Sequence, residues 1–413
     1  MIKEGYKETK IGVIPNEWEV KSINEVTSYV DYRGKTPSKT KTGIFLITAK
    51  NIKMGYIDYK ISKEYISKEE YNIVMKRGYP KKGDVLITTE APLGNVAQID
   101  TENIALAQRV IKYRGMDNVL NNNYLKYYLL SPKFQSKLFK KATGSTAKGI
   151  KGKVLHNLSI LIPPLKEQQK IAEILTKWDN HIETLENLIS KKEEYKKGLM
   201  QNLLTGKVRF PGFNEEWKEV KLGEIGEFIS GFGFPITEQG LVGLELPFYK
   251  VSDMNLPKNN VYMNEEANSI SYDTLTKLKG KTLPKNSIIF AKVGEALFLN
   301  RRRITLKECC VDNNMMGYIT NNKYGNFKFI YYILINFKFQ KIANVGALPS
   351  INAKDLKTVK IQLPPLEEQE KIAEVLTLQD NEIEILKEKL ELLKLQKKGL
   401  MQKLLTGEIR VKC

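Results

Sequence analysis

Apolar residues recur in alternating steps of four and three along two stretches of the chain, residues 162–206 and 363–413. This heptad pattern predicts two amphipathic helices, each with an apolar seam that needs a packing partner. Polar faults interrupt the seam at Lys192, Lys196, Gln379 and Lys397. The predicted seam residues are Ile171, Leu175, Trp178, Ile182, Leu185, Ile189, Leu199 and Leu203 in the first stretch, and Ile372, Leu376, Ile383, Leu386, Leu390, Leu393, Leu400 and Leu404 in the second.

Both stretches carry the same helix start and stop signals. Prolines and acidic side chains suit the first turn of a helix, and glycine suits a left-handed stop. Between these signals we expect helices of about 38 residues, or roughly 57 Å, with glycines at 198 and 399 that weaken or kink them near their ends. The signals are the proline pairs at 163–164 and 364–365, the acidic residues Glu167, Glu367 and Glu368, and the glycines Gly206 and Gly407.

The two stretches are copies of one block. Residues 162–210 and 363–411 align without a gap and are identical at more than half of their positions. Because each copy needs a partner for its seam, we expect the two helices to pack on each other as an antiparallel intramolecular coiled coil with pseudo-twofold symmetry.

The segments outside the repeat are long enough for one domain each. Short apolar runs separated by Gly, Pro and Asn predict mixed, strand-rich structure in both. Their ends are alike, including Trp18 and Trp217 near the starts, while their middles differ. We predict an α+β protein with domains at 1–161 and 207–362 and spacer helices at 162–206 and 363–413. The predicted strand-like runs include Gly43–Thr48, Asp84–Thr89, Ser287–Ala291 and Lys328–Ile335.

The formal net charge is +19 and the isoelectric point is near 9.4. Almost all of the excess positive charge lies outside the repeated blocks, which favours a nucleic-acid partner over a lysine-rich composition alone. No apolar run is long enough to span a membrane, and no signal peptide is evident. The cysteines, Cys309, Cys310 and Cys413, form neither a disulfide framework nor a zinc motif, so we expect a cytoplasmic protein.

No motif in the chain predicts catalysis or a metal site. The segment Gly144–Lys151 resembles a phosphate loop, but Ile150 stands where that loop needs lysine. The proline pairs lack the polar and aromatic neighbours of the amino-methyltransferase signature. Only two histidines, His156 and His181, are present, which argues against a catalytic triad or a histidine metal cluster. The sequence therefore indicates binding without chemistry.

Basic and amide side chains in the two domains are the candidates for DNA contact. Arg, Lys, Asn and Gln can pair with base edges or phosphates, although each is also an ordinary solvated loop residue. The candidates are Tyr32, Arg33, Lys35, Thr36, Lys39, Lys50, Asn51, Gln108, Arg109 and Lys148 in the first domain, and Lys292, Arg301, Arg302, Arg303, Asn313 and Asn314 in the second.

The whole chain resembles the specificity subunit of type I restriction–modification systems. The resemblance lies in the twice-repeated PPLxEQxKIAExL, the KKGLMQxLLTG helix end, the domain start at Glu216–Ile225 and RGKTP at Arg33–Pro37. It implies two target-recognition domains held apart by two antiparallel helices, each domain reading one half of a bipartite target in double-stranded DNA.

The resemblance also implies partners and leaves alternatives open. Two modification (methyltransferase) subunits would dock on the helices and restriction (translocase–nuclease) subunits would join them, with S-adenosylmethionine, ATP and magnesium bound by those partners. The chain itself would then bind no cofactor and no metal. The alternatives are a specificity subunit of a type IIB or IIG-like system, a self-sufficient methyltransferase or nuclease, and a structural coiled-coil protein that binds DNA without sequence preference.

Overall fold

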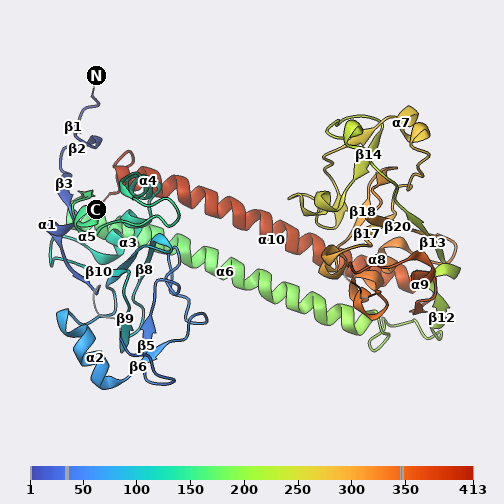
Figure 1. Ribbon diagram of the computed structural model, residues 1–413, viewed down its shortest axis with the longest axis horizontal. Coiled ribbons are helices and arrows are strands. Elements are labelled where there is room, and N and C mark those ends of the chain that lie inside the picture. The colour runs from blue at the N-terminus through green and yellow to red at the C-terminus, as the bar shows by residue number, and fades with distance from the viewer. Residues whose placement is uncertain (1, 33–36, 345, 347, 413) are drawn as a thin grey trace. The chain divides into compact units, whose positions relative to one another are not determined.

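The computed structural model describes residues 2–32, 37–344, 346 and 348–412. The chain forms two compact units, residues 1–186 with 389–413, and residues 187–388. Helices α6 (Leu165–Leu203) and α10 (Leu366–Thr406) each contribute one part to each unit (Figure 1). Each unit therefore contains one strand-rich domain and parts of both long helices.

A four-stranded antiparallel sheet forms the centre of the domain in the first unit. Its order is β4-β10-β7-β8, and a separate three-stranded sheet has the order β6-β5-β9. The predicted runs 43–48 and 84–89 correspond to β5 and β7. The strands are β1 (Tyr6–Thr9), β2 (Gly12–Pro15), β3 (Glu19–Ser22), β4 (Thr27–Asp31), β5 (Ile44–Ile47), β6 (Tyr65–Ile66), β7 (Val85–Thr89), β8 (Leu93–Gln98), β9 (Ile104–Leu106), β10 (Val110–Gly115) and β11 (Ser159–Ile162).

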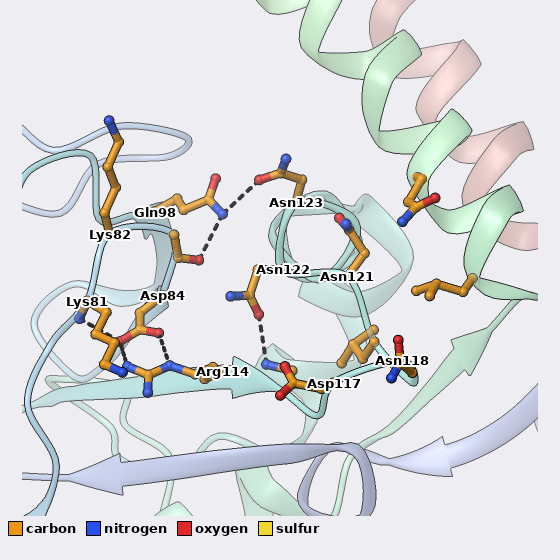
Figure 2. A pocket seen from close by; sticks show the side chains of 15 residues that line it. Lys81, Lys82, Asp84, Gln98, Arg114, Asp117, Asn118, Asn121, Asn122 and Asn123 are labelled. Atoms are coloured by element: carbon orange, nitrogen blue, oxygen red, sulfur yellow. Dashed lines mark hydrogen bonds and ion pairs between the residues drawn. The ribbon is translucent and has the colours of Figure 1, made fainter.

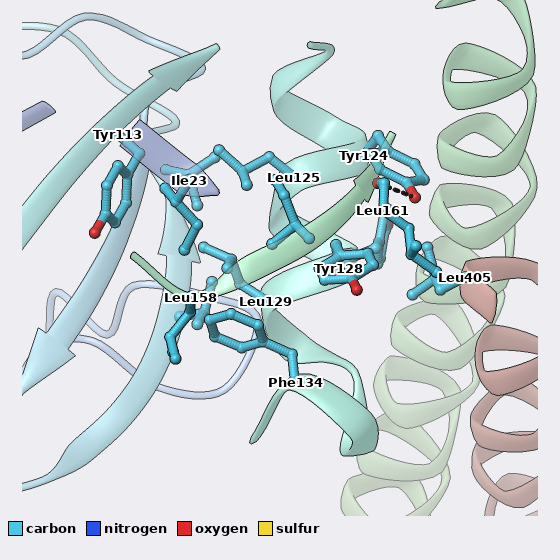
Figure 3. Close-up of a cluster of buried hydrophobic side chains, with 14 of the residues drawn as sticks. Ile23, Tyr113, Tyr124, Leu125, Tyr128, Leu129, Phe134, Leu158, Leu161 and Leu405 are labelled. Carbon is cyan, nitrogen blue, oxygen red and sulfur yellow. Dashed lines mark hydrogen bonds between the residues drawn. The ribbon is translucent and has the colours of Figure 1, made fainter. Parts of the chain in front are cut away.

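The main core of this unit lies between the four-stranded sheet and the helices. Figure 3 shows Tyr124, Leu125 and Leu129 of α3 together with Leu405 of α10 in this cluster. Apolar residues of α6, including Ile171, join the same core, so the domain and the helix pair fold as one hydrophobic unit. The shorter helices are α1 (Ile23–Val26), α2 (Lys68–Val74), α3 (Asn122–Leu130), α4 (Pro132–Lys141) and α5 (Gly152–His156).

The second unit repeats this plan with a larger sheet. A five-stranded sheet has the order β13-β20-β17-β18-β15, and a three-stranded sheet has the order β16-β14-β19. The predicted run 287–291 corresponds to β17. The strands are β12 (Lys218–Lys221), β13 (Gly226–Ser230), β14 (Leu246–Tyr249), β15 (Tyr262–Met263), β16 (Ser269–Ile270), β17 (Ile288–Ala291), β18 (Arg302–Thr305), β19 (Cys310–Val311), β20 (Met315–Thr320) and β21 (Lys360–Leu363).

One predicted strand-like run is a helix. Residues 328–335 lie inside α8 (Phe327–Asn336), because the side chain of Asn326 accepts hydrogen bonds from the amides of Lys328 and Phe329 and caps the first turn. An apolar run of eight residues fits either a buried strand or a buried helix, and here the cap decides. The other short helices of this unit are α7 (Tyr272–Lys277) and α9 (Ala353–Lys357).

The ends of the long helices follow their sequence signals. Gly206 and Gly407 adopt left-handed φ values of +68° and +75° just beyond the helices, as a glycine stop predicts. Gly198 and Gly399 do not interrupt α6 and α10, which continue through both residues. Both helices therefore tolerate the glycines, because the packed apolar face of each helix offsets the weak helix propensity of glycine.

Helices α6 and α10 pack against each other in opposite directions. In the first unit Lys394 of α10 pairs with Glu186 of α6 at 3.0 Å, and in the second unit Lys387 of α10 pairs with Glu193 of α6 at 2.6 Å. Residue numbers fall along one helix as they rise along the other, which requires an antiparallel pair. None of the predicted seam residues is exposed, so the heptad pattern marks the packed face.

In the first unit, the start of α6 is anchored through a buried carboxylate. Glu167 is 2% exposed and accepts a hydrogen bond from the indole of Trp18 at 3.0 Å. Its two oxygens also accept from the guanidinium of Arg410, at 2.6 and 2.9 Å. The carboxylate therefore ties the start of the domain and the segment after α10 to the first turn of α6.

The second unit has the same anchor at the start of α10. Glu368 is fully buried and accepts from Trp217 at 3.0 Å and from Arg209 at 2.7 and 2.9 Å. The sequence predicted that Glu167 and Glu368 stabilise the first turn of each helix, and the structure shows that they also accept hydrogen bonds from the domain. They are the buried acceptors that hold each domain on its helix.

Candidate functional site

Two of the predicted DNA-contact residues in the first domain lie together at one edge of the central sheet. Gln108 and Arg109 immediately precede β10, and Glu90 immediately follows the neighbouring strand β7. Arg109 has a left-handed φ of +69°, and its guanidinium forms an exposed ion pair with Glu90 at 3.1 Å. The pairing of β7 with β10 therefore brings these polar side chains to one edge.

A closed loop that contains Lys148 borders the same edge. The amides of Thr143 and Gly149 donate to each other's carbonyls at 2.9 Å, and Gly149 bridges Glu90. Gly144 has a φ of +108°, and a Cβ there would lie 2.3 Å from the Ala147 carbonyl oxygen, so only glycine fits. Residues 143–148 are exposed, and the loop is available to a ligand at this edge.

The second domain has an equivalent edge with different side chains. Asn313 and Asn314 immediately precede β20 and are exposed, and the amide of Lys292, the residue after β17, donates to the Asn314 carbonyl at 2.8 Å. Asn344 and Ser350 close the adjoining loop through their backbone groups. We call these two places the reading edges: Glu90, Gln108, Arg109 and residues 143–149 in the first domain, and Lys292, Asn313, Asn314 and the ends of loop 344–350 in the second.

Two candidates in the first domain are buried structural residues. Tyr32 is 2% exposed, its hydroxyl donates to the Gly78 carbonyl, and burial raises its pKa. Asn51 has no exposed surface, and its amide group donates to the carbonyls of Asp58 and Ile61 while accepting from Thr48. Both side chains are therefore bonded inside the domain and present almost no surface to a ligand, which the sequence did not indicate because it shows the type of a side chain but not its burial.

The arginine cluster of the second domain is also largely structural. Arg302 is 1% exposed, stacks 3.8 Å from the centroid of the Phe339 ring, and has its pKa lowered by burial. Arg303 donates to the backbone carbonyls of Met254 and Asn259. Arg302 therefore presents almost no surface to a ligand, and the guanidinium of Arg303 is bonded to its own loop. Arg301 is half-buried, and its guanidinium contacts the side chain of Asn255.

Two other candidates of the first domain lie on its surface. Lys39 is exposed and pairs with Glu64 at 2.8 Å, and Lys50 is exposed in the loop after β5. Arg33, Lys35 and Thr36 lie outside the described residues. The structure thus groups Gln108, Arg109 and Lys148 at one edge and Lys292, Asn313 and Asn314 at the other.

A polar hollow of about 510 Å³, which the sequence did not indicate, lies at the end of β7 and β10 that is opposite to the reading edge (Figure 2). Asp84 lies beneath it, 1% exposed, and accepts a two-pronged contact from Arg114 at 2.6 and 2.7 Å. Lys112 approaches the same carboxylate at 3.5 Å. Burial lowers the pKa of Lys112, while the hydrogen bond to Asp84 raises the pKa of Arg114.

Exposed donors surround this hollow. Lys81 and Lys82 are exposed at its rim, and Gln98 donates to the side chain of Asn123 at 2.8 Å. In the second domain Ser287 stands directly before β17 and Ile319 lies in β20, where the first domain has Asp84 and Arg114. The hollow therefore belongs to the part of the molecule in which the two domains differ.

The residues that the structure describes contain neither a candidate metal-binding cluster nor a membrane-spanning helix. No group of three or more His, Cys, Asp or Glu side chains within that part of the chain could hold a metal ion. No helix among the same residues is long and apolar enough to cross a membrane. Of the two histidines, His156 is buried and stacked on Tyr29, and its Nδ1 lies 2.8 Å from the hydroxyl of Tyr113.

Most of the chain matches one protein family. Residues 15–193 and 214–395 match the model of the type I restriction modification DNA specificity domain. Each matched segment begins in a domain and ends inside a long helix, so the unit that occurs twice is a domain followed by most of one helix. The family model therefore describes the duplicated unit of this chain.

Known proteins resemble the chain over nearly its full length. It is 31% identical to a protein of Methanocaldococcus jannaschii assigned as the specificity subunit of type I restriction enzyme MjaX, over 99% of this chain and 98% of that one. It is 27% identical to the MjaVIII specificity subunit of the same organism, over 99% and 97%.

Solved structures share the fold. An S subunit of a type I restriction–modification system from M. genitalium has a TM-score of 0.58 at 18% identity, covering 94% of this chain and 96% of that one. A chain from work on complex assembly and conformational transition of the type I R-M system has a TM-score of 0.57 at 19% identity, covering 96% and 99%. At these identities the likeness concerns the fold.

Proposed function

The chain belongs to the family of DNA specificity subunits of type I restriction–modification systems, and from this membership we propose that each of its two domains reads one half of a two-part DNA target. Subunits of this family supply DNA specificity and are non-catalytic. The observation that carries the proposal is the pair of reading edges. They occupy equivalent places in the two domains and present different polar side chains.

The chemistry of the edges suits base recognition in the major groove. Arginine pairs in two-pronged fashion with guanine, and glutamine or asparagine pairs with adenine. Gln108 and Arg109 therefore offer one set of donors and acceptors, while Asn313 and Asn314 offer another. The lysines Lys148 and Lys292 suit the phosphates that flank the contacted bases. Two unlike edges predict two unlike half-sites.

We propose that the long helices space and connect the domains. The domains are residues 1–161 and 207–362, and the spacers are residues 162–206 and 363–413. Support comes from the continuity of α6 and α10, which run without a break from one unit into the other over 39 and 41 residues. In this reading the length of the helices sets the number of base pairs between the half-sites.

The partners and cofactors follow from the family. Two modification subunits dock on the helix pair and restriction subunits join them, in the cytoplasm. S-adenosylmethionine, ATP and magnesium belong to those partner subunits. The support in this chain is the exposed outer surface of α6 and α10, whose opposite faces form the packed seam.

The test is to map methylated sites in cells that carry the three subunits. We expect Q108A/R109A to relax or abolish recognition in one half-site only, and N313A/N314A to affect the other only, at roughly 1–3 kcal/mol for each lost two-pronged contact. Lys7→Ala, in β1, removes an exposed charge outside both edges and outside the helix pair and serves as the control. If both double variants changed the same half-site, or neither changed any, the assignment of the edges would be wrong.

A further inference from the structure

A partly buried polar node joins three helices in the first unit. The hydroxyl of Tyr127, on α3, donates to Asp179 of α6 at 2.6 Å and lies 3.1 Å from the hydroxyl of Thr176. The same carboxylate forms an ion pair with Lys397 of α10, and Lys126 of α3 lies 4.0 Å from it. Tyr127 has no exposed surface, and 19% of the Lys397 side chain and 38% of the Asp179 side chain are exposed. One carboxylate therefore connects the domain to both long helices.

The second unit contains the same node with the helices exchanged. Tyr332, on α8, donates to Asp380 of α10 at 2.7 Å, and Thr377 is its second neighbour. Asp380 forms an ion pair with Lys196 of α6, and 19% and 14% of the lysine and aspartate side chains are exposed. The two polar faults Lys196 and Lys397 in the heptad seam are thus the cations of two equivalent nodes.

The apolar part of the seam cannot select one register by itself. Its residues repeat every seven positions, so a slip of one helix by a heptad again sets apolar side chains against apolar side chains. The two innermost rows are Leu175, Ile182, Ile189, Lys196 and Leu203 in α6, and Leu376, Ile383, Leu390, Lys397 and Leu404 in α10. In both rows the one polar member is the lysine of a node.

A slip by one heptad would break both nodes. In one direction Lys196 would face Ala373 and would lose its partner in a half-buried place. In the other direction Lys196 would face Lys387, a like charge, and only Lys397 would find a new carboxylate, that of Glu186. A buried charge without its partner is strongly unfavourable, and like charges at close range add repulsion. Only the observed register satisfies both lysines.

We propose that the two nodes are positioning elements that select one register of α6 against α10 and so fix the number of base pairs between the half-sites. The second part of this statement rests on the proposed function, whereas the first does not. A single polar group in a coiled-coil seam is the best-attested device for fixing register, at some expense of stability. Each tyrosine also fixes the position of its domain relative to the helices, because its hydroxyl donates to the same carboxylate.

The register can be measured without DNA. Spin labels on cysteines introduced at the exposed positions Lys170 of α6 and Lys398 of α10, both in the first unit, report one distance in the native register. A slip of seven residues moves one label along the axis by about 10 Å. The native Cys413 is replaced by serine throughout, and circular dichroism checks that each variant is folded.

The decisive variant replaces both ion pairs by leucine, as D179L/K397L with D380L/K196L. We expect this variant to stay folded, with its unfolding midpoint unchanged or raised, and to show additional distances displaced from the native one. The swapped variant D380K/K196D, with the first node left native, keeps both ion pairs and should return a single distance. If the leucine variant does not fold, K196L/D380L removes the second node only. We expect this variant to show the displaced distances in a smaller share of the molecules.

A matched control removes an ion pair that does not join the helices. Lys371 and Glu374 pair at 2.8 Å within α10 and are both exposed, so K371Q/E374Q should leave the distance unchanged. A single native distance in the leucine variant, or in the single-node variant, would overturn the proposal, because it would mean that the nodes only stabilise the fold.

Site mapping then separates this proposal from the proposed function. In cells with the partner subunits, the leucine variant should modify sites with more than one gap length while its half-sites stay the same. If the distances multiply but no bipartite site is recognised by the unaltered protein, the proposed function fails and the register proposal stands. If the distances multiply and the gap stays fixed, the link between register and gap is overturned.

Discussion

Replacing the buried anchor Glu167 by glutamine tests how each domain is held on its helix. The carboxylate is 2% exposed, and all three of its neighbours are donors: the indole of Trp18 and two nitrogens of Arg410. Glutamine keeps the shape but exchanges one acceptor oxygen for an NH₂ group. In either orientation that group faces an N–H donor, so at least one buried donor loses its partner.

The magnitude follows from these contacts. A hydrogen bond between charged groups contributes about 1.5–3 kcal/mol, and an unsatisfied buried donor costs about 1–3 kcal/mol. Arg410 is about one third exposed and can be hydrated in part. This hydration favours the lower end of both ranges of free energy. We expect Glu167→Gln to lower the free energy of unfolding of the first unit by about 2–4 kcal/mol, or its Tm by about 6–12 °C for a loss of about 3 kcal/mol.

The assay must report on each unit separately, because a chain with two units need not unfold in one step. Hydrogen exchange followed by mass spectrometry gives the opening free energy of peptides from each unit. Glu17→Gln removes an exposed partner of the same arginine and should cost at most about 1 kcal/mol. Glu368→Gln should repeat the large effect in the second unit. Equal effects of Glu167→Gln and Glu17→Gln would refute the reasoning.

Three further predictions concern groups outside the helix anchors. Burial raises the pKa of the Cys310 thiol to about 12 and that of Cys309 further, so neither should react with Ellman's reagent in the folded protein once the C-terminal cysteine is replaced by serine, and reaction without denaturant would contradict this. Burial also raises the pKa of the Asp312 carboxyl; Asp312→Asn should stabilise the second unit at neutral pH and lose this advantage as the pH falls through the raised pKa, measured by urea unfolding across that range. Gly407→Ala should destabilise by more than about 1 kcal/mol because its φ is +75° and a Cβ would meet a proline ring at 2.5 Å, whereas Gly399→Ala, with open space around it, should stabilise by up to about 1 kcal/mol in the same melts.

Much of the scaffold could be predicted because its apolar residues recur at a regular spacing in the sequence. The seam residues repeat every seven positions, and the side chains that obey that period are the ones that pack. The use of Lys196 and Lys397 could not be predicted in this way. A polar residue in a seam looks like a fault until the antiparallel register places Asp380 and Asp179 opposite to it.

The candidate DNA contacts were harder to predict for the same reason. Sequence gives the type of a side chain, but burial depends on contacts between distant segments. Asn51 and Arg302 have suitable chemistry and almost no accessible surface. Gln108 and Lys148 are forty residues apart and lie at the same edge because β7 pairs with β10 and the loop closes on Glu90.

In each domain the contacts that anchor it to a helix are separate from the reading edge. This separation is a physical reason why the edges can differ while the scaffold does not. Gln168 accepts from the amide of Asn121 and donates to the Pro163 carbonyl, and Gln369 makes the equivalent bonds to Asn326 and Pro364. These contacts, like the carboxylate anchors and the tyrosine nodes, all lie where a domain meets its helix. The reading edges take part in none of them. A change of side chain at an edge therefore leaves the anchoring contacts intact, and the two halves can recognise different bases on one scaffold.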